Sequence, residues 1–301
     1  MNTAAVTGVS VALPGVTSPQ GLLGPAVPGA APVDPAAVIG KKGLRYKDRA
    51  TQIGLCLAFS ALDDAGLLDG TGLTAPGDRI GVVVSSNLGN ADTVCRAVET
   101  IAKETTSGLS PMDTPNASSN IIASETAIRY GLRGPNLTVC NGATSGLDAV
   151  RWAQLMVRSG RAEHMVVIGV EPDNPVTRRL VDGPVADGGA ALVVSRSGAA
   201  GPTAAVKALL GAQVRTARTA AAVARLTETA PGATLWLTGE PDIAPPGEQR
   251  YGLTGWGELS GALGVVQCAA ATAWFADGHE GPAYALADGA GAALLAPERS
   301  S

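Results

Sequence analysis

The chain has 301 residues, of which 46% are hydrophobic, 16% charged and 3% aromatic, so it can bury a core built largely from small aliphatic side chains. Its net charge of −4 argues against a nucleic-acid-binding surface. The chain has two histidines, and its four cysteines show no CxxC spacing. We therefore expect no metal site, no disulfide framework and no cofactor. The N-terminus lacks the basic region of a signal peptide, and no uncharged apolar stretch of about 18 residues is free of Pro or Gly, so we expect a cytoplasmic protein.

The first 90 residues alternate between strand and helix patterns. Alternating β-branched residues predict a strand over Ala4–Leu13, and the proline-rich stretch Thr17–Ile39 is expected to be a loop without helix. Asp48 is expected to open a helix that ends at Gly66. The run Arg79–Ser86 has the composition of a buried parallel strand, and a glycine-rich turn and a helix follow it.

A strand, a sharp turn, a helix and a second strand then follow one another. After a predicted helix over Asn116–Tyr130, residues Asn136–Cys140 indicate a strand. The small residues of NGATSG turn into an amphipathic helix, and His164–Val170 returns as a strand. A turn of this kind, here called an elbow, places helical N–H groups and the positive end of the helix dipole beside the side chain at the turn. Enzymes often carry a nucleophile at such a position.

Two pieces of the chain are weakly repeated. ADGGAALVV (186–194) is similar to ADGAGAALL (287–295), and NGATSGLDAV has a counterpart in GELSGALGVV, which leads into an apolar helix ending near Phe275. The spacing within the two copies differs, so the second copy is shortened. The repeat predicts an α/β fold of two related halves, with two mainly parallel sheets that sandwich helices.

These residues resemble the thiolase-fold condensing enzymes of the β-ketoacyl synthase superfamily over most of the chain. TGVSVALPG is similar to the opening strand, DRATQIGLCLAFSALDDAGL to the first long helix, and RIGVVVSSNLGN to the next strand and its glycine turn. GLRGPNLTV with the elbow is the most specific block, and YALADGAGAALLAP resembles the closing hairpin without its usual aromatic residues. The resemblance implies one compact α/β unit, a layered α-β-α-β-α sandwich of a thiolase-like N-terminal half (1–198) and a shortened C-terminal half (199–301).

The catalytic residues of that superfamily are missing at the matching positions. Aligned on GPN and the following Thr-Ser-Gly, the place of the nucleophilic cysteine is held by Ala143, whose methyl group cannot attack a thioester. The Gly-His-x-x-Gly-Ala motif has Glu258 in place of histidine, and LTGEPDIAPPGEQR, which stands for the second histidine motif, contains no imidazole. Without these three residues neither nucleophilic attack nor enolate stabilisation is available, so we expect no catalytic residue.

The superfamily includes a subunit that fits these losses. This is the chain-length factor of type II polyketide synthases, which pairs with an active ketosynthase and shapes the tunnel for the growing chain. GLDAV after the elbow is similar to chain-length factors. Those of aromatic pathways commonly have Gln at the position of Ala143, which favours the reducing, polyene-type systems. The resemblance thus implies a heterodimer with an active β-ketoacyl synthase, acting on chains held by the phosphopantetheine of an acyl carrier protein, with no nucleic-acid or membrane partner.

Candidate tunnel and interface residues follow from the same resemblance. Residues Ser110–Asn120 fall where the family lines the acyl tunnel across the subunit boundary, and dimers of the superfamily pair an edge strand, here NLTVC. The candidates are Met112, Asp113, Thr114, Asn116, Asn136, Thr138 and Cys140. The basic stretch Lys41–Arg49 is either a solvated loop or a surface that steers an acidic acyl carrier protein.

Two other interpretations stay open on the sequence. One is an acyl-thioester hydrolase, acyltransferase or decarboxylase that uses Glu258, Cys140 or a bound water, and the other is an acyl-binding scaffold protein. Against the first, Cys140 is expected to be a small buried apolar residue. Glu258 is expected to be structural or solvent-exposed, and Asp148 an ordinary residue of a first helical turn. His164 and His279 are expected to be exposed.

Overall fold

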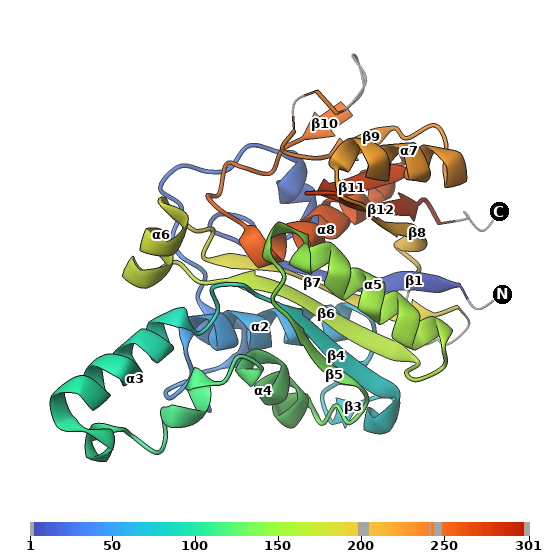
Figure 1. Ribbon diagram of the computed structural model, residues 1–301. Helices are drawn as coiled ribbons and strands as arrows, with labels where there is room; N and C mark the ends of the chain where they lie inside the picture. The colour runs from blue at the N-terminus through green and yellow to red at the C-terminus, as the bar shows by residue number, and fades with distance from the viewer. Residues whose placement is uncertain (1–2, 198–204, 241, 244–248, 298–301) are drawn as a thin grey trace.

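Ten strands form one sheet in the computed structural model, which describes residues 3–197, 205–240, 242–243 and 249–297. Its order is β10-β9-β11-β12-β8-β1-β7-β6-β4-β5 (Figure 1). The middle of the sheet is narrow, because β1 (Ala4–Ala12) and β8 (Ala208–Arg215) pair only at Ala5↔Leu209 and Val6↔Ala208. The sheet therefore consists of two five-strand arrays that are joined at this narrow seam.

The remaining elements are these. The strands of the first array are β1, β4 (Ile80–Ser85), β5 (Asn136–Val139), β6 (His164–Glu171) and β7 (Gly188–Arg196), and those of the second are β8, β9 (Leu235–Leu237), β10 (Gln249–Tyr251), β11 (Ala283–Ala287) and β12 (Ala290–Leu295). The α-helices are α1 (Pro35–Ile39), α2 (Arg49–Asp64), α3 (Ala91–Glu104), α4 (Ile121–Tyr130), α5 (Ser145–Arg158), α6 (Pro175–Val181), α7 (Thr219–Thr229) and α8 (Leu263–Ala276). Short 3-10 turns are η1 (Pro19–Leu23), η2 (Gly77–Arg79), η3 (Thr106–Gly108), η4 (Thr114–Ala117), η5 (Gly142–Thr144) and η6 (Ser260–Ala262), and β2 (Leu68–Asp69) pairs with β3 (Gly72–Leu73) apart from the sheet.

The two arrays have the same strand order. The first reads β1-β7-β6-β4-β5 from the seam outward, and the second reads β8-β12-β11-β9-β10. In each array the first strand in sequence lies beside the last, and the third lies at the outer edge. The weak sequence repeat thus corresponds to a repeated topology. The division expected between residues 198 and 199 lies outside the described residues.

The prediction of mainly parallel sheets is wrong. β4 is parallel to β5 and β6, but β7 is antiparallel to both β6 and β1, and the second array repeats this mixture. The reason is clearest at β11 and β12, which are joined by the tight turn Asp288–Gly289 with φ angles of +41° and +80°. A two-residue turn of this kind forces a hairpin, whereas parallel strands need a long crossover.

Helices α2 and α1 show one prediction confirmed and one corrected. Asp48 caps α2 as expected, because its Oδ1 accepts a hydrogen bond from the Thr51 N–H at 2.8 Å. The proline-rich stretch Thr17–Ile39, however, contains η1 and α1. Each begins with a proline, which is compatible with a first helical position, and Asp34 caps α1.

Five layers of helices and strands alternate through the molecule (Figure 1). Helices α2 and α4 cover the first array, α7 covers the second, and α5 and α8 lie between the two arrays. The middle helices touch at their first turns, since a Cβ added to Gly264 would lie 2.3 Å from the Leu147 nitrogen. The small side chains that dominate the composition permit this close packing.

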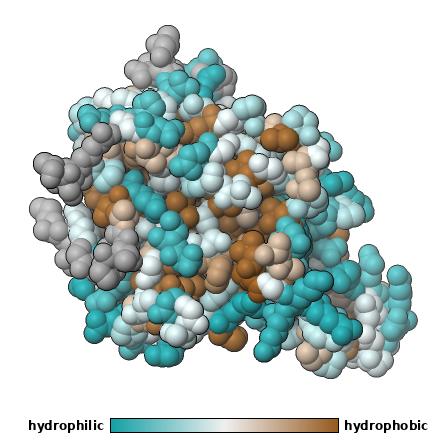
Figure 2. Space-filling view, turned by 180° about the vertical axis from the view of Figure 1, so that it is seen from behind, coloured by the Kyte–Doolittle hydropathy of each residue, from teal (hydrophilic) through white to brown (hydrophobic). Residues whose placement is uncertain are grey.

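The surface is less uniform than the core. On the side opposite to that of Figure 1, hydrophobic patches lie between hydrophilic groups across the middle of the face (Figure 2). Helix α3 projects from the body (Figure 1), and only Thr93 of its fourteen residues is buried. Its exposed residues include Val94, Val98 and Ile101. Within the described ranges no helix combines the length and hydrophobicity needed to cross a membrane.

Candidate functional site

The first elbow connects β5 to α5 through η5. Gly142 has a φ of +70°, a conformation that a side chain would disfavour, and it turns the chain from the strand into the helix. Ala143 follows and is exposed. The fold thus presents the side chain of residue 143 at the beginning of α5, where the helix dipole would stabilise a developing negative charge. A methyl group there can neither attack a thioester nor be acylated.

Short polar side chains hold the first elbow in place. The Ser145 hydroxyl accepts a hydrogen bond from the Asn141 N–H at 2.5 Å. Asp148, one turn into α5, accepts from the Asn141 carboxamide at 2.8 Å and from the Thr144 hydroxyl at 2.9 Å. Asp148 therefore braces the turn, which agrees with the structural role expected of it.

The second elbow, between Gly257 and Leu263, carries Glu258 in the place of a family histidine. The Glu258 side chain is exposed, and its Oε1 accepts a hydrogen bond from the Ser260 N–H at 2.7 Å. The backbone of Glu258 pairs with Pro184 and Ala186. Its carboxylate is thus used to brace its own turn, where Ser260 has a φ of +40°.

One carboxamide joins the two elbows. Asn87, in the loop after β4, donates from Nδ2 to the Gly142 carbonyl at 2.9 Å and to the Ser260 hydroxyl at 2.8 Å. Its Oδ1 accepts from the Ser145 hydroxyl at 3.0 Å. Sequence reasoning missed Asn87, although a polar side chain directly after the buried run that ends at Ser86 was a usable signal.

A buried carboxylate lies behind Asn87. Glu171, at the end of β6, is 0% exposed and accepts hydrogen bonds from the backbone of Asn87, Leu88 and Gly261 and from the Ser86 hydroxyl. Burial raises the pKa of Glu171 to about 7, and the hydrogen bonds oppose part of that rise. Sequence reasoning missed this residue too, although a single charge that ends an otherwise apolar strand indicates a special role.

The two histidines lie away from the elbows. His164 is 2% exposed, so the expectation that it is exposed is wrong. It begins β6 in the interior of the first array, its Nδ1 lies 2.8 Å from the Ser195 hydroxyl, and burial lowers its pKa. His279 is exposed, as expected, and stacks on Trp274. In the part of the chain that is described, no three His, Cys, Asp or Glu side chains cluster as metal ligands.

The interface candidates lie on a free sheet edge. The carbonyls of Pro135 and Val139 face β4, so the backbone groups of Asn136, Thr138 and Cys140 point outward by the alternation of a strand. Asn136 is exposed, whereas Thr138 is half-buried, and its hydroxyl has no partner among the described residues. Cys140 is exposed, which corrects the expectation of a buried thiol. The correction has a simple cause, because Cys140 follows β5, which pairs with no strand on its outer side within the described residues.

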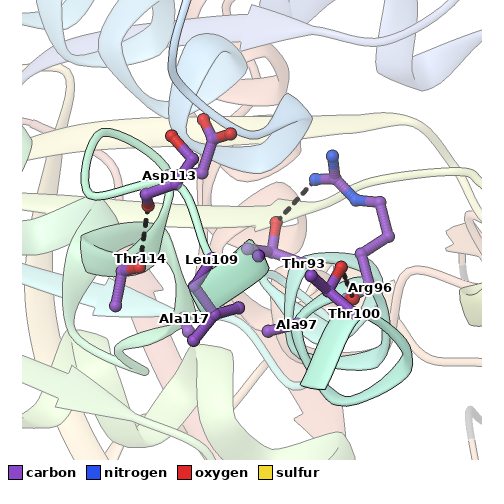
Figure 3. A pocket seen from close by; sticks show the side chains of 10 residues that line it. Thr93, Arg96, Ala97, Thr100, Leu109, Asp113, Thr114 and Ala117 are labelled. Carbon is purple, nitrogen blue, oxygen red and sulfur yellow. Dashed lines mark hydrogen bonds between the residues drawn. The ribbon is translucent and has the colours of Figure 1, made fainter. Parts of the chain in front are cut away.

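Of the four tunnel candidates, two line a cavity and two do not. A cavity of about 210 Å³ lies between α3 and residues 108–117, and Asp113 and Thr114 line it opposite Thr93 and Arg96 (Figure 3). Met112 is 60% exposed and does not line this cavity. Asn116 is buried, and its Nδ2 donates to the Tyr46 carbonyl at 2.6 Å.

The basic segment 41–49 also divides into two groups. Arg49 makes a two-point hydrogen bond to Asp187, and Lys47 forms an ion pair with Glu125 at 2.5 Å. The side chains of the other basic residues of the segment are exposed and form no ion pair within the described residues. These residues are Lys41, Lys42 and Arg45.

With this geometry in view, the sequence comparisons identify the family. Residues 24–183, more than half of the chain, match the model "Beta-ketoacyl synthase, N-terminal domain". The chain therefore belongs to the β-ketoacyl synthase family.

The chain is 33% identical over 133 residues to a 3-oxoacyl-[acyl-carrier-protein] synthase 2 of Vibrio harveyi, a match covering 44% of this chain and 31% of that protein. A granaticin polyketide putative β-ketoacyl synthase 1 of Streptomyces violaceoruber is 34% identical over 144 residues, covering 46% of this chain and 33% of its own length. Each match thus spans about a third of the curated relative.

Solved structures extend the likeness to the whole fold. The ishigamide ketosynthase/chain length factor superposes with a TM-score of 0.74 at 23% identity, covering 98% of this chain and 99% of that one. A type II polyketide synthase ketosynthase in complex with its acyl-carrier protein superposes with a TM-score of 0.79 at 16% identity, covering 99% and 100%. The expected thiolase-like α/β ketosynthase fold is confirmed.

Proposed function

We propose that this chain is a non-catalytic, chain-length-factor-like subunit that pairs with an active β-ketoacyl synthase and shapes the acyl tunnel in type II polyketide synthesis, of the reducing polyene type. One observation carries the proposal. The fold presents Ala143 at the beginning of α5, and the surrounding polar groups of Asn87, Ser145 and Ser260 are engaged with one another. A ketosynthase site without a nucleophile or an imidazole suits a subunit whose partner performs the chemistry.

The surface around β5 supports a protein partner. Within the described residues β5 pairs with no strand on its outer edge, and the backbone donors and acceptors of that edge are groups that another strand can bind. Exposed apolar residues lie on the helices beside it, with Ile128 of α4 76% exposed, Trp152 of α5 44% and Leu155 of α5 50%. An edge strand flanked by apolar side chains is costly to leave in water. We therefore assign Asn136, Thr138 and Cys140 to the ketosynthase interface.

The decisive experiment is co-expression with an active type II ketosynthase from the same organism. We expect a stable complex, and a Thr138→Pro variant should lose it, because proline removes the outward N–H without touching the bonds to β4. Thr138→Val keeps that N–H and is the matched control. A monodisperse homodimer of the wild-type chain with no affinity for the ketosynthase would contradict the proposal, as would a Thr138→Pro chain that still binds like Thr138→Val.

The cavity beside α3 is the proposed contribution to the tunnel. Asp113 and Thr114 line it and are the first residues to vary, and Asn116 fixes the loop to the basic segment. Met112, which is 60% exposed, is proposed to contact the partner instead. Enlarging Ala117, which also lines the cavity, to Leu should shorten the products of the reconstituted complex. Unchanged product length would show that this cavity is not part of the acyl tunnel.

The second proposed partner is an acyl carrier protein that bears a phosphopantetheine-bound chain. Lys41 and Lys42 are exposed beside an open cavity of about 570 Å³, whose apolar lining includes Phe59 and Tyr130. A double reversal to Glu at Lys41 and Lys42 should weaken carrier-protein binding at least tenfold at low salt, and less at high salt because of screening. Reversal of the exposed Arg218 and Arg225 matches the charge change and should have little effect. An equal loss of carrier-protein affinity in the two variants would show that the effect comes from the net charge of the chain and not from the position of Lys41 and Lys42.

One observation favours a second function, that of an acyl-thioester enzyme. The Cys140 thiol is exposed three residues before Ala143 and is open to attack a thioester. Turnover of acyl or malonyl thioesters by the isolated chain, lost in Cys140→Ser, would establish this activity in place of the first proposal. No turnover by either chain would exclude it.

A further inference from the structure

Arg129, in the last turn of α4, is bound to a loop that lies 87 to 90 positions earlier in the chain. Its Nη1 donates to the Lys42 carbonyl at 3.1 Å, and its Nη2 donates to the Ile39 carbonyl at 3.0 Å. The Ile39 carbonyl belongs to the last residue of α1, where a helix leaves its carbonyls unpaired. A Cβ added to Gly43 would lie 3.3 Å from Arg129 Nη1, so the loop packs directly against the guanidinium. These contacts hold the guanidinium in a fixed orientation beside the loop.

Neither Arg129 nor Lys42 has an acidic partner within the described residues. Both line the open cavity of about 570 Å³, and none of the described residues that line it is acidic. Two acids on the adjoining helices are bound elsewhere, since Glu125 of α4 forms an ion pair with Lys47 and Asp34 caps α1. The wall of the cavity therefore carries two positive charges that no described side chain pairs with.

The rest of the cavity is apolar or uncharged. Val38, Phe59 and Tyr130 contribute to its lining. The Tyr130 hydroxyl donates to the Leu55 carbonyl at 2.7 Å, and burial raises the pKa of Tyr130 to about 12, so this side chain is neutral near pH 7. A cationic wall beside an uncharged lining suits a ligand that has an anionic group at one end and an uncharged chain at the other.

The two cations favour phosphate as the anionic group. A guanidinium presents a planar set of N–H donors that matches phosphate oxygens, and a lysine adds a mobile point charge. We propose that Arg129 and Lys42 bind the phosphate of a phosphopantetheine arm, whose uncharged chain lies along Val38 and Phe59. The arm belongs either to the carrier protein or to coenzyme A. The carrier as its source rests on the proposed function, whereas the affinity for the phosphate rests on this cavity alone.

Titration of the full chain with 4′-phosphopantetheine and with pantetheine, which lacks the phosphate, tests the cavity. We expect the wild type to bind 4′-phosphopantetheine about tenfold more tightly than pantetheine at low salt. Arg129→Lys keeps the charge but not the planar donor set, and it should remove most of this difference. Arg133→Lys, at an exposed arginine, is the matched control. Equal affinity of the wild type for the two compounds would overturn the proposal, as would an Arg129→Lys variant that distinguishes them as well as the wild type does.

A second variant keeps the test independent of the folding of Arg129→Lys. Lys42 is exposed, so Lys42→Gln should fold as the wild type does, and loss of its charge should weaken 4′-phosphopantetheine binding about fivefold. Arg45 is also exposed but is not among the residues that line the cavity, so Arg45→Gln should have a smaller effect. Equal losses in these two variants would show that the phosphate responds only to the net charge of the chain, and would overturn the proposed site.

The two sources of the arm are distinguished with the carrier protein itself. If the carrier supplies the arm, its holo form should bind more tightly than its apo form, which lacks the arm, and Arg129→Lys should weaken only the holo form. Equal binding of the two forms, together with binding of coenzyme A, would assign the cavity to coenzyme A. Binding of 4′-phosphopantetheine without any carrier affinity would contradict the proposed carrier partner and leave the cavity supported. Carrier binding without discrimination between 4′-phosphopantetheine and pantetheine would overturn the cavity alone.

Discussion

The two elbows share a local sequence pattern, yet their helices lie in different surroundings. Helix α8 buries eleven of its fourteen residues, whereas α5 buries eight and exposes Trp152 and Leu155. The buried Glu171 side chain binds the second elbow from inside the protein. The first elbow instead follows β5, the strand at the edge of the sheet. A repeated motif thus yields one inward-facing copy, which stabilises the fold, and one outward-facing copy, which is available to a partner.

The largest effect is expected where the two elbow helices touch. Gly264→Ala places a methyl group against the Leu147 backbone and should lower the free energy of unfolding by about 3 kcal/mol, measured by urea denaturation. Gly183→Ala is the control, since a Cβ there meets no atom within 4 Å. Similar stability of the two variants would mean that the helices can move apart at no cost.

The next effect concerns the buried carboxyl group of Glu171, which contacts the second elbow through Gly261. Because Glu171 has a raised pKa in the folded state, its contribution to stability is complete below pH 4.5 and is lost as the pH rises through about 7. The loss should reach about 3 kcal/mol by pH 8 relative to Glu171→Gln. Parallel curves of unfolding free energy against pH for the two chains would contradict this account.

At the outward-facing elbow, binding should change while stability does not. Trp152→Ala should weaken the affinity for the ketosynthase at least tenfold, about 1.4 kcal/mol, in a titration of the two purified subunits. Leu180→Ala removes a comparably exposed apolar side chain on α6 and should bind as the wild type does. An equal loss in the control would remove the distinction between the two surfaces.

The smallest effect is expected at Ala143. In a Cys140→Ser background, Ala143→Cys should change the unfolding free energy by less than about 0.5 kcal/mol, because the side chain is exposed. Peptide mass spectrometry should show iodoacetamide labelling at residue 143. Condensing activity should stay absent, since no histidine lies at either elbow. Condensation by this variant would show that the missing imidazoles are dispensable.

Local sequence patterns predicted the elements that depend on local chemistry. The helix capped by Asp48, the strand before the first elbow and the elbow itself lie where composition and periodicity place them. The β-ketoacyl synthase family was predicted from the same segments. The helical turns in Thr17–Ile39 were missed because proline is a helix breaker in the interior of a helix but an acceptable first residue.

The site was less predictable, because burial depends on strand order. Cys140 directly follows β5, the outermost strand of the first array, whereas His164 begins β6, an inner strand. Their exposures are therefore the reverse of those expected. Asn87 and Glu171 lie 173 and 90 positions from the residues of the second elbow that they bind, so no local pattern shows that they hold it.

By itself, then, the sequence determined the family and the absence of a nucleophile at residue 143, since both follow from the identity of residues in a short motif. Only the tertiary structure decided which side chains form hydrogen bonds around residue 143, which elbow faces outward, and that the Glu171 carboxyl group is buried without a cation beside it. These properties depend on contacts between distant segments, and such contacts exist only once the sheet order has brought the segments together.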